Sequence, residues 1–288
     1  MTTEINWNEF RCRCSAIRKL LSNGKEGQQI TENQKEELNR LLEKEKRTEK
    51  QEEEVKRLQQ LKANSGKVVL GETCIEYLME VYAWETEGMI SVGKESLDVM
   101  QLKKGKVGEA EAGMLLSVVD GEIYLQDKNR IKNDYLSGEI DFYLGDSVYK
   151  ATNITDVKNA FDYPGFLKKI NGGLENGQRE QLAGYGDITG AKDLFIANCL
   201  ISFTTEMITD MEYKILRKLN CTTTESPEFL EIWPNIARSM VFDNIPPQQR
   251  VHKIRVEPFS EFEQQKLYDR VKYCRDFLWK FYEERQKL

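Results

Sequence analysis

Histidine is nearly absent from this sequence of 288 residues, which contains only His252. Reactions that need a histidine beside a nucleophile, and metal sites built from two histidines, therefore have little support. Long apolar runs are absent as well, since none reaches the roughly 18 residues of a membrane-spanning helix. Residues 1–7 also lack the basic and apolar regions of a signal peptide. The sequence therefore predicts a cytoplasmic protein without a membrane span.

Closely spaced cysteines are scarce too. The six cysteines include one close pair, Cys12 and Cys14, and no second pair that would complete a tetrahedral zinc site. We therefore expect no structural metal, and we predict that the cysteines are reduced and serve as small apolar residues. The formal charge of −6 argues against a surface coated with basic residues, although a local cationic groove could still hold phosphates.

The chain is nevertheless long and apolar enough to fold around a substantial core. Hydrophobic residues make up 40% of it and charged residues 31%, which favours one large domain with an added helical segment. We predict three parts: a helical N-terminal segment over residues 1–100, a core over residues 101–215, and a C-terminal segment over residues 216–288 whose helix packs on the core.

Residue periodicity predicts the elements of these parts. An apolar stripe at spacings of three and four predicts a helix over residues 7–21. A capping box at Thr31 and Gln34 begins a long charged helix or helical hairpin, whose charges fit a solvated face better than a binding surface. A last helix is expected from about residue 261. Between them, helices are expected at residues 104–118 and 178–185, and strands at 122–125, 139–144, 149–158 and 194–201.

Charged residues interrupt two of these strands. In the first, period-two alternation turns Asp141 away from the apolar side chains beside it. In the second, the same period places Asp156 and Lys158 on one face and Val157 on the other. If the two strands pair across the turn between them, Asp141 comes next to Asp156, and the two negative charges repel unless a cation neutralises them.

Mg²⁺ is the cation that suits this pair. It prefers oxygen ligands, keeps several waters, and is commonly held by one or two carboxylates together with a substrate phosphate. Hydrolysis of a phosphodiester needs an activated water and stabilisation of charge on the phosphoryl oxygens, both of which a metal can supply. Lys158 would orient or activate the water and stabilise the developing charge. By itself this pattern is a weak signal, because two acidic residues and a lysine often fall at such spacings by chance.

Two helices offer further polar groups. A third acidic ligand could come from the helix before the strands, where Glu109 is preferred and Glu111 is the alternative, since residues two apart do not share a helix face. After the strands, Gln181 and Tyr185 lie four apart on a helix, so both can reach the metal site or a nearby phosphate. The competing interpretation is a surface helix and a strand pair with ordinary solvent-facing charges.

Four motifs occur in an order and at spacings that make chance a poor explanation. Taken together they resemble the successive motifs of RecB-like nucleases of the PD-(D/E)XK superfamily. Residues 6–15 and 245–251 extend the similarity over nearly the whole chain, and resemble those of phage and prophage exonucleases of the YqaJ or lambda-exonuclease type. The four motifs are Lys104-Gly105-x-x-x-Glu109-x-Glu111, residues 133–141, Asp156-Val157-Lys158 and Gln181-Leu182-x-x-Tyr185.

The resemblance implies an α/β fold in which a central mixed β-sheet is flanked by helices, with a helical N-terminal segment and a C-terminal helix. It implies that Glu109, Asp141 and Asp156 hold the metal together with the carbonyl of Val157. It also implies that Lys158 assists catalysis.

The resemblance further concerns the DNA end. In relatives, an arginine and a serine of the N-terminal motif contact the DNA terminus, which points here to Arg11, Arg13 and Ser15. The chain departs from many relatives at Glu180, where they have an aromatic residue, and just after Lys158, where they have a serine-rich stretch. These departures concern substrate contacts rather than metal chemistry.

The expected function is that of a Mg²⁺-dependent exodeoxyribonuclease, with Mn²⁺ as a substitute metal. It would degrade one strand of linear double-stranded DNA from 5′ to 3′ and expose a 3′ single strand for a single-strand annealing protein in phage-type recombination. The resemblance also implies a homo-oligomer, a trimer in relatives, in the cytoplasm of a bacterial host. Two alternatives stay open: a structure-specific or 3′-directed nuclease of the same fold, and a non-catalytic protein that binds DNA ends or a recombinase.

Overall fold

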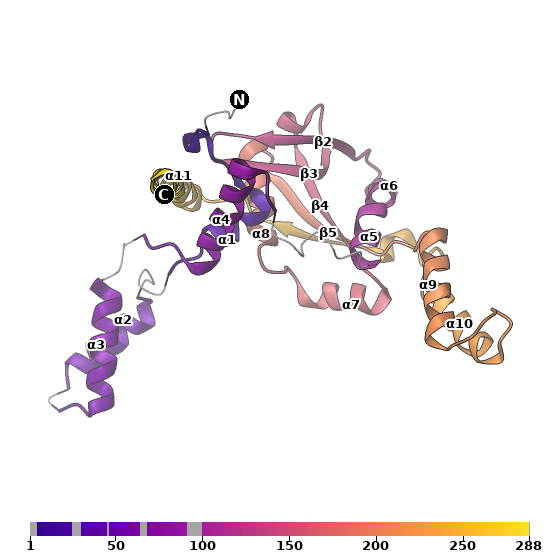
Figure 1. Cartoon of the computed structure of the whole chain (residues 1–288), viewed down its shortest axis with the longest axis horizontal. Helices are drawn as coiled ribbons and strands as arrows, with labels where there is room; N and C mark the ends of the chain where they lie inside the picture. The colour runs from indigo at the N-terminus through magenta and orange to yellow at the C-terminus, as the bar shows by residue number, and fades with distance from the viewer. Residues whose placement is uncertain (1–4, 25–29, 45, 64–67, 91–99, 288) are drawn as a thin grey trace. The chain divides into compact units, whose positions relative to one another are not determined.

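The computed structural model describes residues 5–24, 30–44, 46–63, 68–90 and 100–287 (Figure 1). These residues form two compact units. The sheet unit contains residues 11–17 and the described residues between 91 and 266, and the helical unit contains the described residues up to 10, from 18 to 90, and from 267 onward. The three-part division expected from the sequence stays a prediction.

The sheet unit is built on one mixed β-sheet (Figure 1). Its order is β1-β3-β4-β5-β6, and β2 pairs with β3 as well. β1 and β3 are parallel, as are β4 and β5, whereas the remaining pairs are antiparallel. This arrangement confirms the predicted α/β class with a mixed sheet. The strands are β1 Cys12–Arg13, β2 Leu125–Lys132, β3 Leu136–Leu144, β4 Asn153–Asn159, β5 Asp193–Cys199 and β6 Val251–Val256.

Helices and short 3-10 turns make up most of the remaining described chain. None of the described helices is both long and apolar enough to span a membrane. The 3-10 turns are η1 Trp7–Glu9, η2 Cys14–Ala16, η4 Val148–Lys150 and η5 Pro247–Gln249. The helices are α1 Ile17–Leu20, α2 Glu32–Leu42, α3 Glu49–Ala63, α4 Glu72–Glu87, α5 Met100–Val107, α6 Glu109–Asp120, α7 Tyr163–Gly172, α8 Gln178–Thr189, α9 Thr205–Lys218, α10 Pro227–Arg238 and α11 Glu261–Gln286.

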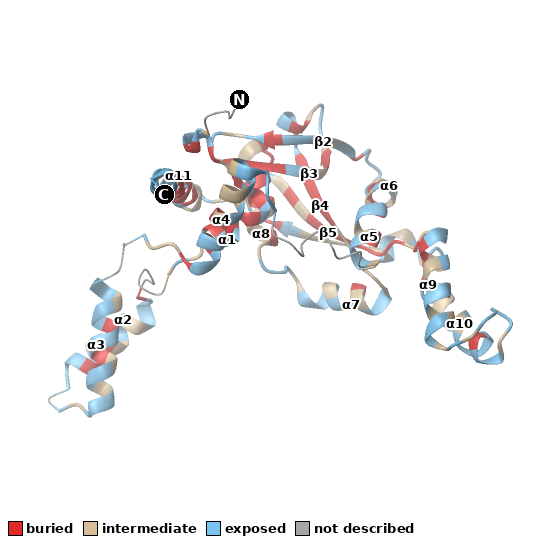
Figure 2. Ribbon diagram, in the orientation of Figure 1, coloured by how far each residue is buried: buried red, intermediate tan, exposed pale blue. Residues whose placement is uncertain are grey.

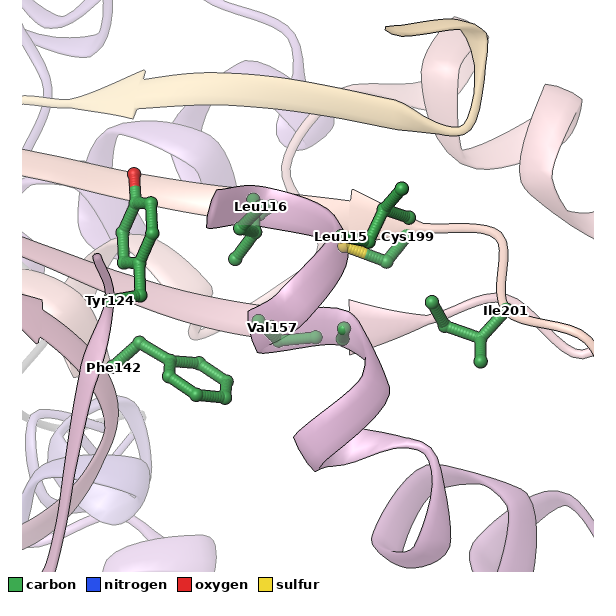
Figure 3. Close-up of a cluster of buried hydrophobic side chains, with 9 residues drawn as sticks. Leu115, Leu116, Tyr124, Phe142, Val157, Cys199 and Ile201 are labelled. Atoms are coloured by element: carbon green, nitrogen blue, oxygen red, sulfur yellow. The ribbon is translucent and has the colours of Figure 1, made fainter. Parts of the chain in front are cut away.

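One face of the sheet packs against α6. Figure 3 shows Leu115 and Leu116 of this helix among Phe142 of β3 and Val157 of β4. A Cβ added to Gly113 would lie 2.4 Å from the ring of Phe142, so only a glycine lets the helix approach β3 this closely. Because strand side chains alternate, the burial of Phe142 and Val157 here turns their strand neighbours toward the opposite face.

The helical unit contains a charged hairpin formed by α2 and α3. The predicted capping box at Thr31 and Gln34 is confirmed, because each side chain binds the backbone of the other residue. The apolar contacts of the hairpin are few, and Figure 2 shows exposed residues along most of both helices. Its buried side chains are Ile30, Leu38, Leu41, Val55 and Leu58.

The prediction of one helix over residues 7–21 is wrong. Asn6 caps a 3-10 turn, and Cys12 and Arg13 then pair with Leu136 and Ser137 as strand β1. The amide of Cys12 donates to the carbonyl of Tyr135 at 2.9 Å. Contacts with a distant strand therefore override the local helical pattern, as tertiary context often does.

Other boundaries differ as well. The helix predicted at residues 104–118 is two helices, α5 and α6, separated at Gly108. The strand predicted at residues 122–125 begins only at Leu125, because Gly121 ends α6 in a left-handed conformation and residues 122–124 form the connection. The sequence analysis also did not predict α7, α9, α10 and β6.

Candidate functional site

The two aspartates singled out in the sequence lie opposite each other. β3 and β4 are antiparallel, with Phe142 opposite Thr155, so the next position in the same register places Asp141 opposite Asp156. Cross-strand partners share a face of the sheet. The amide of Val157 donates a hydrogen bond of 2.7 Å to Oδ2 of Asp141. The other oxygen of Asp141 accepts no hydrogen bond from the described residues.

Lys158 completes this cluster. Its Nζ lies 2.6 Å from Oδ2 of Asp156, whose side chain is only 2% exposed. Two neighbouring carboxylates therefore lie near one ammonium group, which pairs with Asp156 and acts on Asp141 through its charge. Burying a charged group is costly unless it is paired, so the excess negative charge favours a further cation.

The pKa values reflect the same imbalance. Burial, and then the charge of Asp156, raises the pKa of Asp141 to about 7. Burial also raises the pKa of Asp156, although Lys158 opposes the rise. For Lys158, burial lowers the pKa, but the charge of Asp156 and its hydrogen bond outweigh burial and raise the pKa above its ordinary value. Lys158 is therefore an ammonium donor at neutral pH rather than a base.

Helix α8 supplies two polar groups to the cluster. Nε2 of Gln181 donates to Oδ1 of Asp156 at 3.1 Å and to the hydroxyl of Tyr185 at 3.0 Å. The spacing of four residues thus brings both side chains to one place. Burial raises the pKa of Tyr185 well above its ordinary value, so the phenol stays neutral. The structure therefore brings together Asp141, Asp156, Lys158, Gln181 and Tyr185.

Two glycines that the sequence analysis passed over make this packing possible. A Cβ on Gly138 of β3 would lie 2.4 Å from Cε1 of Tyr185. A Cβ on Gly184 of α8 would lie 2.6 Å from Cδ1 of Ile17 and 3.0 Å from Sγ of Cys14. Larger residues would push α8 away from the strand and from η2.

Glu109 is held beside the cluster by strand β2. Gln126 and Lys128 both donate to Oε1 of Glu109, Lys128 at 3.3 Å. The charge of Glu109 helps to raise the pKa of Asp141 and of Asp156, so it acts on both. The sequence analysis did not single out Gln126 and Lys128, because no short-range pattern links β2 with the first turn of α6.

Glu111 lies in a different environment. Burial, and then the charge of Asp243, raises its pKa, whereas Arg250 and Lys104 lower it. None of these groups belongs to the aspartate pair. The helix thus directs Glu109 and Glu111 to different surroundings, as expected for residues two apart on a helix.

The donor set suits a hard divalent cation, even though it is not a closed cage. Within the described ranges, no three acidic, histidine or cysteine side chains are gathered closely enough to hold a metal ion by themselves. Mg²⁺ commonly uses only one or two carboxylates, with waters and phosphate oxygens in the other positions. The aspartate pair, in which Asp156 is buried and one oxygen of Asp141 accepts no hydrogen bond from the described residues, fits that requirement.

The residues expected at a DNA end lie in and around β1. Nε of Arg11 donates to the carbonyl of Asn133 at 2.7 Å. Arg13 lies in β1, opposite Ser137, and is exposed, as is Ser15 in η2. Cys14, between them, is buried beside Gly184 of α8. The part of the N-terminal motif from Arg11 to Ser15 therefore belongs to the sheet unit that contains the aspartate pair.

Comparison with known proteins gives matches among solved structures. A phage-related exonuclease from Haemophilus somnus 129PT is 15% identical, with a TM-score of 0.57 and coverage of 96% of both chains. The alkaline exonuclease LHK-Exo from Laribacter hongkongensis is 10% identical, with a TM-score of 0.52, over 98% of this chain and 93% of its own. LHK-Exo in complex with dAMP matches at the same identity and TM-score. No family model and no curated protein sequence matches. The predicted fold is thus confirmed over nearly the full length.

Proposed function

We propose that this chain is a Mg²⁺-dependent exodeoxyribonuclease that degrades one strand of linear double-stranded DNA. The observation that carries the proposal is the aspartate pair on neighbouring strands with Lys158 beside it. The shared fold supports it, because the similar structures are named as exonucleases and one of them is bound to a nucleotide, dAMP.

In this proposal, Asp141, Asp156 and Glu109 would hold the metal together with the carbonyl of Val157. When bound, Mg²⁺, or Mn²⁺ as a substitute, would supply positive charge that polarises the phosphoryl group and favours ionisation of water. Asp141 and Asp156 are preorganised by the amide of Val157 and by the side chain of Gln181, which limits the reorganisation needed when the cation binds.

Lys158 acts on the substrate. Its raised pKa keeps the ammonium group charged, so it stabilises negative charge on the scissile phosphate and orients the attacking water by hydrogen bonding. Tyr185 stays neutral, and its hydroxyl accepts the hydrogen bond that holds Gln181 in place. These roles require no histidine, which agrees with a sequence that contains only one.

Substrate polarity and partners are part of the same proposal. Arg11, Arg13 and Ser15 contact the DNA terminus, and degradation from the 5′ end exposes a 3′ single strand for an annealing protein. A homo-oligomer, for which a trimer is the form implied by the resemblance, would keep the enzyme on its substrate in the bacterial cytoplasm.

Digestion of linear duplexes labelled at the 5′ or the 3′ end, with and without Mg²⁺, tests the proposal. We expect Mg²⁺-dependent loss of the 5′ label first and resistance of a closed circular duplex. First release of the 3′ label would reverse the polarity but keep the enzyme class. Efficient cutting of the circle would indicate an endonuclease, and no cleavage of any duplex with Mg²⁺ or Mn²⁺ would overturn the proposal.

A further inference from the structure

Lys104 of α5 is a lysine buried among aromatic rings. The residue is only 2% exposed. Its Nζ lies 3.9 Å from the ring centroid of Phe203 and 5.3 Å from that of Phe242. Its hydrogen-bond partner among the described residues is the carbonyl of Phe161, at 2.6 Å. A buried ammonium group is costly, so this position is not explained by apolar packing alone.

The charged groups near Lys104 act from a distance. Burial lowers its pKa to about 8, while Asp162 and then Glu111 oppose the change. Neither acidic residue forms an ion pair with Lys104 among the described residues. The hydrogen bond to the Phe161 carbonyl and the aromatic rings are therefore the main compensation for burial.

A second hydrogen bond joins the same two segments. Nδ2 of Asn159, the last residue of β4, donates to the carbonyl of Gly105 at 3.3 Å. Lys104 and Asn159 thus tie the end of α5 to the residues that directly follow Lys158. We call these two hydrogen bonds the α5–β4 clamp. It joins the strand that contains Asp156 to the helix that precedes Glu109.

Gly108 connects the clamp to Glu109, so the position of the clamp fixes the position of the Glu109 backbone. It is the N-cap of α6, and Glu109 is the first residue of that helix. A Cβ on Gly108 would lie 2.9 Å from the carbonyl oxygen of Lys104 and 3.1 Å from Nδ2 of Asn159. The turn between the helices is therefore packed tightly against both members of the clamp, and a shift of either one would move the start of α6.

We propose that Lys104 and Asn159 are positioning residues that keep Glu109 near Asp141 and Asp156, so that it can serve as the third ligand when a divalent cation draws the three carboxylates together. This rests on the proposed function. Gln126 and Lys128 orient the carboxylate of Glu109 from β2, and the clamp sets the position of its backbone. The simpler alternative is that Lys104 only fills space in the aromatic cluster, and a methionine would fill that space equally well.

Lys104→Met is the main test, and Lys103→Met is its matched control. Methionine keeps an unbranched apolar chain of similar length but cannot donate to the carbonyl of Phe161. The neighbouring Lys103 pairs with Glu206 at 2.9 Å and with Asp210 at 3.2 Å near the surface, so its replacement leaves the clamp intact. Mg²⁺ binding is measured by calorimetry on the full chain without DNA, and kcat and KM are measured on linear duplex.

We expect Lys104→Met to weaken Mg²⁺ binding and lower kcat by about 10-fold each, the range typical of residues that support metal ligands. KM for DNA should change less than about 2-fold, since the clamp touches no substrate. Asn159→Leu, which removes the other hydrogen bond, should act in the same direction. Lys103→Met should match the wild type in all three quantities.

The outcomes separate the clamp from the proposed function. Wild-type Mg²⁺ affinity in Lys104→Met overturns the clamp while the wild-type enzyme still degrades DNA. If Lys104→Met does not fold, Asn159→Leu decides, since normal Mg²⁺ affinity in that variant also overturns the clamp. A wild-type chain that neither binds Mg²⁺ nor degrades DNA overturns the proposed function, and the clamp with it.

Discussion

Two charged regions of this protein differ in what surrounds their charges. In the α2–α3 hairpin, acidic and basic side chains pair three residues apart on exposed helix faces, as Glu54 and Arg57 do at 2.5 Å. In the sheet unit, Asp156 is buried and Asp141 partly buried, and the one ammonium group near them pairs with Asp156. Exposed pairs contribute little because water already solvates them, whereas an unbalanced buried pair is costly.

The difference shows where function is to be sought in a charged sequence. Charged residues are denser in the hairpin segment, but the ion pairs described there are local and solvated. The sheet unit keeps a costly arrangement, and its pKa shifts follow from that cost. Strongly shifted groups in one place are typical of functional sites, although structural networks can produce them too.

The largest expected effect comes from removing the charges of Asp156 and Lys158. Asp156→Asn keeps the shape of the side chain, and Lys158→Met keeps most of its length. Each should lower the Mg²⁺-dependent rate of DNA degradation by about 100-fold or more, because the charge acts directly on the metal or the phosphate. Glu54→Gln in the hairpin is the control and should keep the wild-type rate. Activity of either sheet variant within a few-fold of wild type would remove the proposed mechanism.

The pH dependence of stability should distinguish the two regions next. The pKa of Asp141 is raised from 3.8 to about 7, so between these values the folded protein holds a proton that the unfolded chain releases. The free energy of unfolding should therefore fall as pH rises through this interval and stay low above it. Melting temperatures at pH 5 and pH 8 should show this fall, and Asp141→Asn should make it smaller.

Mg²⁺ provides the complementary measurement. A cation that binds only the folded state raises its stability, and it competes with protons for the aspartates. The increase in melting temperature on adding Mg²⁺ should be larger at pH 8 than at pH 5. An equal increase at both values, or the same increase in Asp141→Asn, would show that the ion acts elsewhere.

A smaller effect on stability is expected from Gly138→Ala. The added methyl group would meet the ring of Tyr185, so overpacking should cost about 1–3 kcal/mol of unfolding free energy and displace the Tyr185–Gln181 pair. Gly172→Ala is the matched control, because nothing lies within 4 Å of a Cβ at that position. Denaturant unfolding of both variants measures the difference, and equal stabilities would show that α8 can shift without cost.

The smallest effect is expected in the hairpin itself. Arg57→Ala removes an exposed ion pair with Glu54 and should change the free energy of unfolding by less than about 0.5 kcal/mol. The change should shrink further at high salt, because salt screens exposed charges. A loss of several kcal/mol would mean that this pair matters structurally, and that the contrast between the two regions is weaker than their exposure indicates.

Much of the site could be predicted from short-range patterns. Alternation in two strands predicts that Asp141 and Asp156 share a face, and the spacing of Gln181 and Tyr185 predicts a common direction. These inferences succeed because strand and helix periods depend only on backbone geometry. The same reasoning was wrong for residues 7–21, whose apolar spacing resembles a helix although part of the segment pairs with β3.

The sequence by itself therefore determined which side chains lie on the same face of each strand and helix, since local periodicity depends only on consecutive residues. Only the tertiary structure decided what each of those faces meets: β2 with Glu109, α8 with Gly138, and Lys104 with the carbonyl of Phe161. These contacts join residues far apart in the chain, and their stability depends on shape and burial. No spacing along the sequence encodes either property.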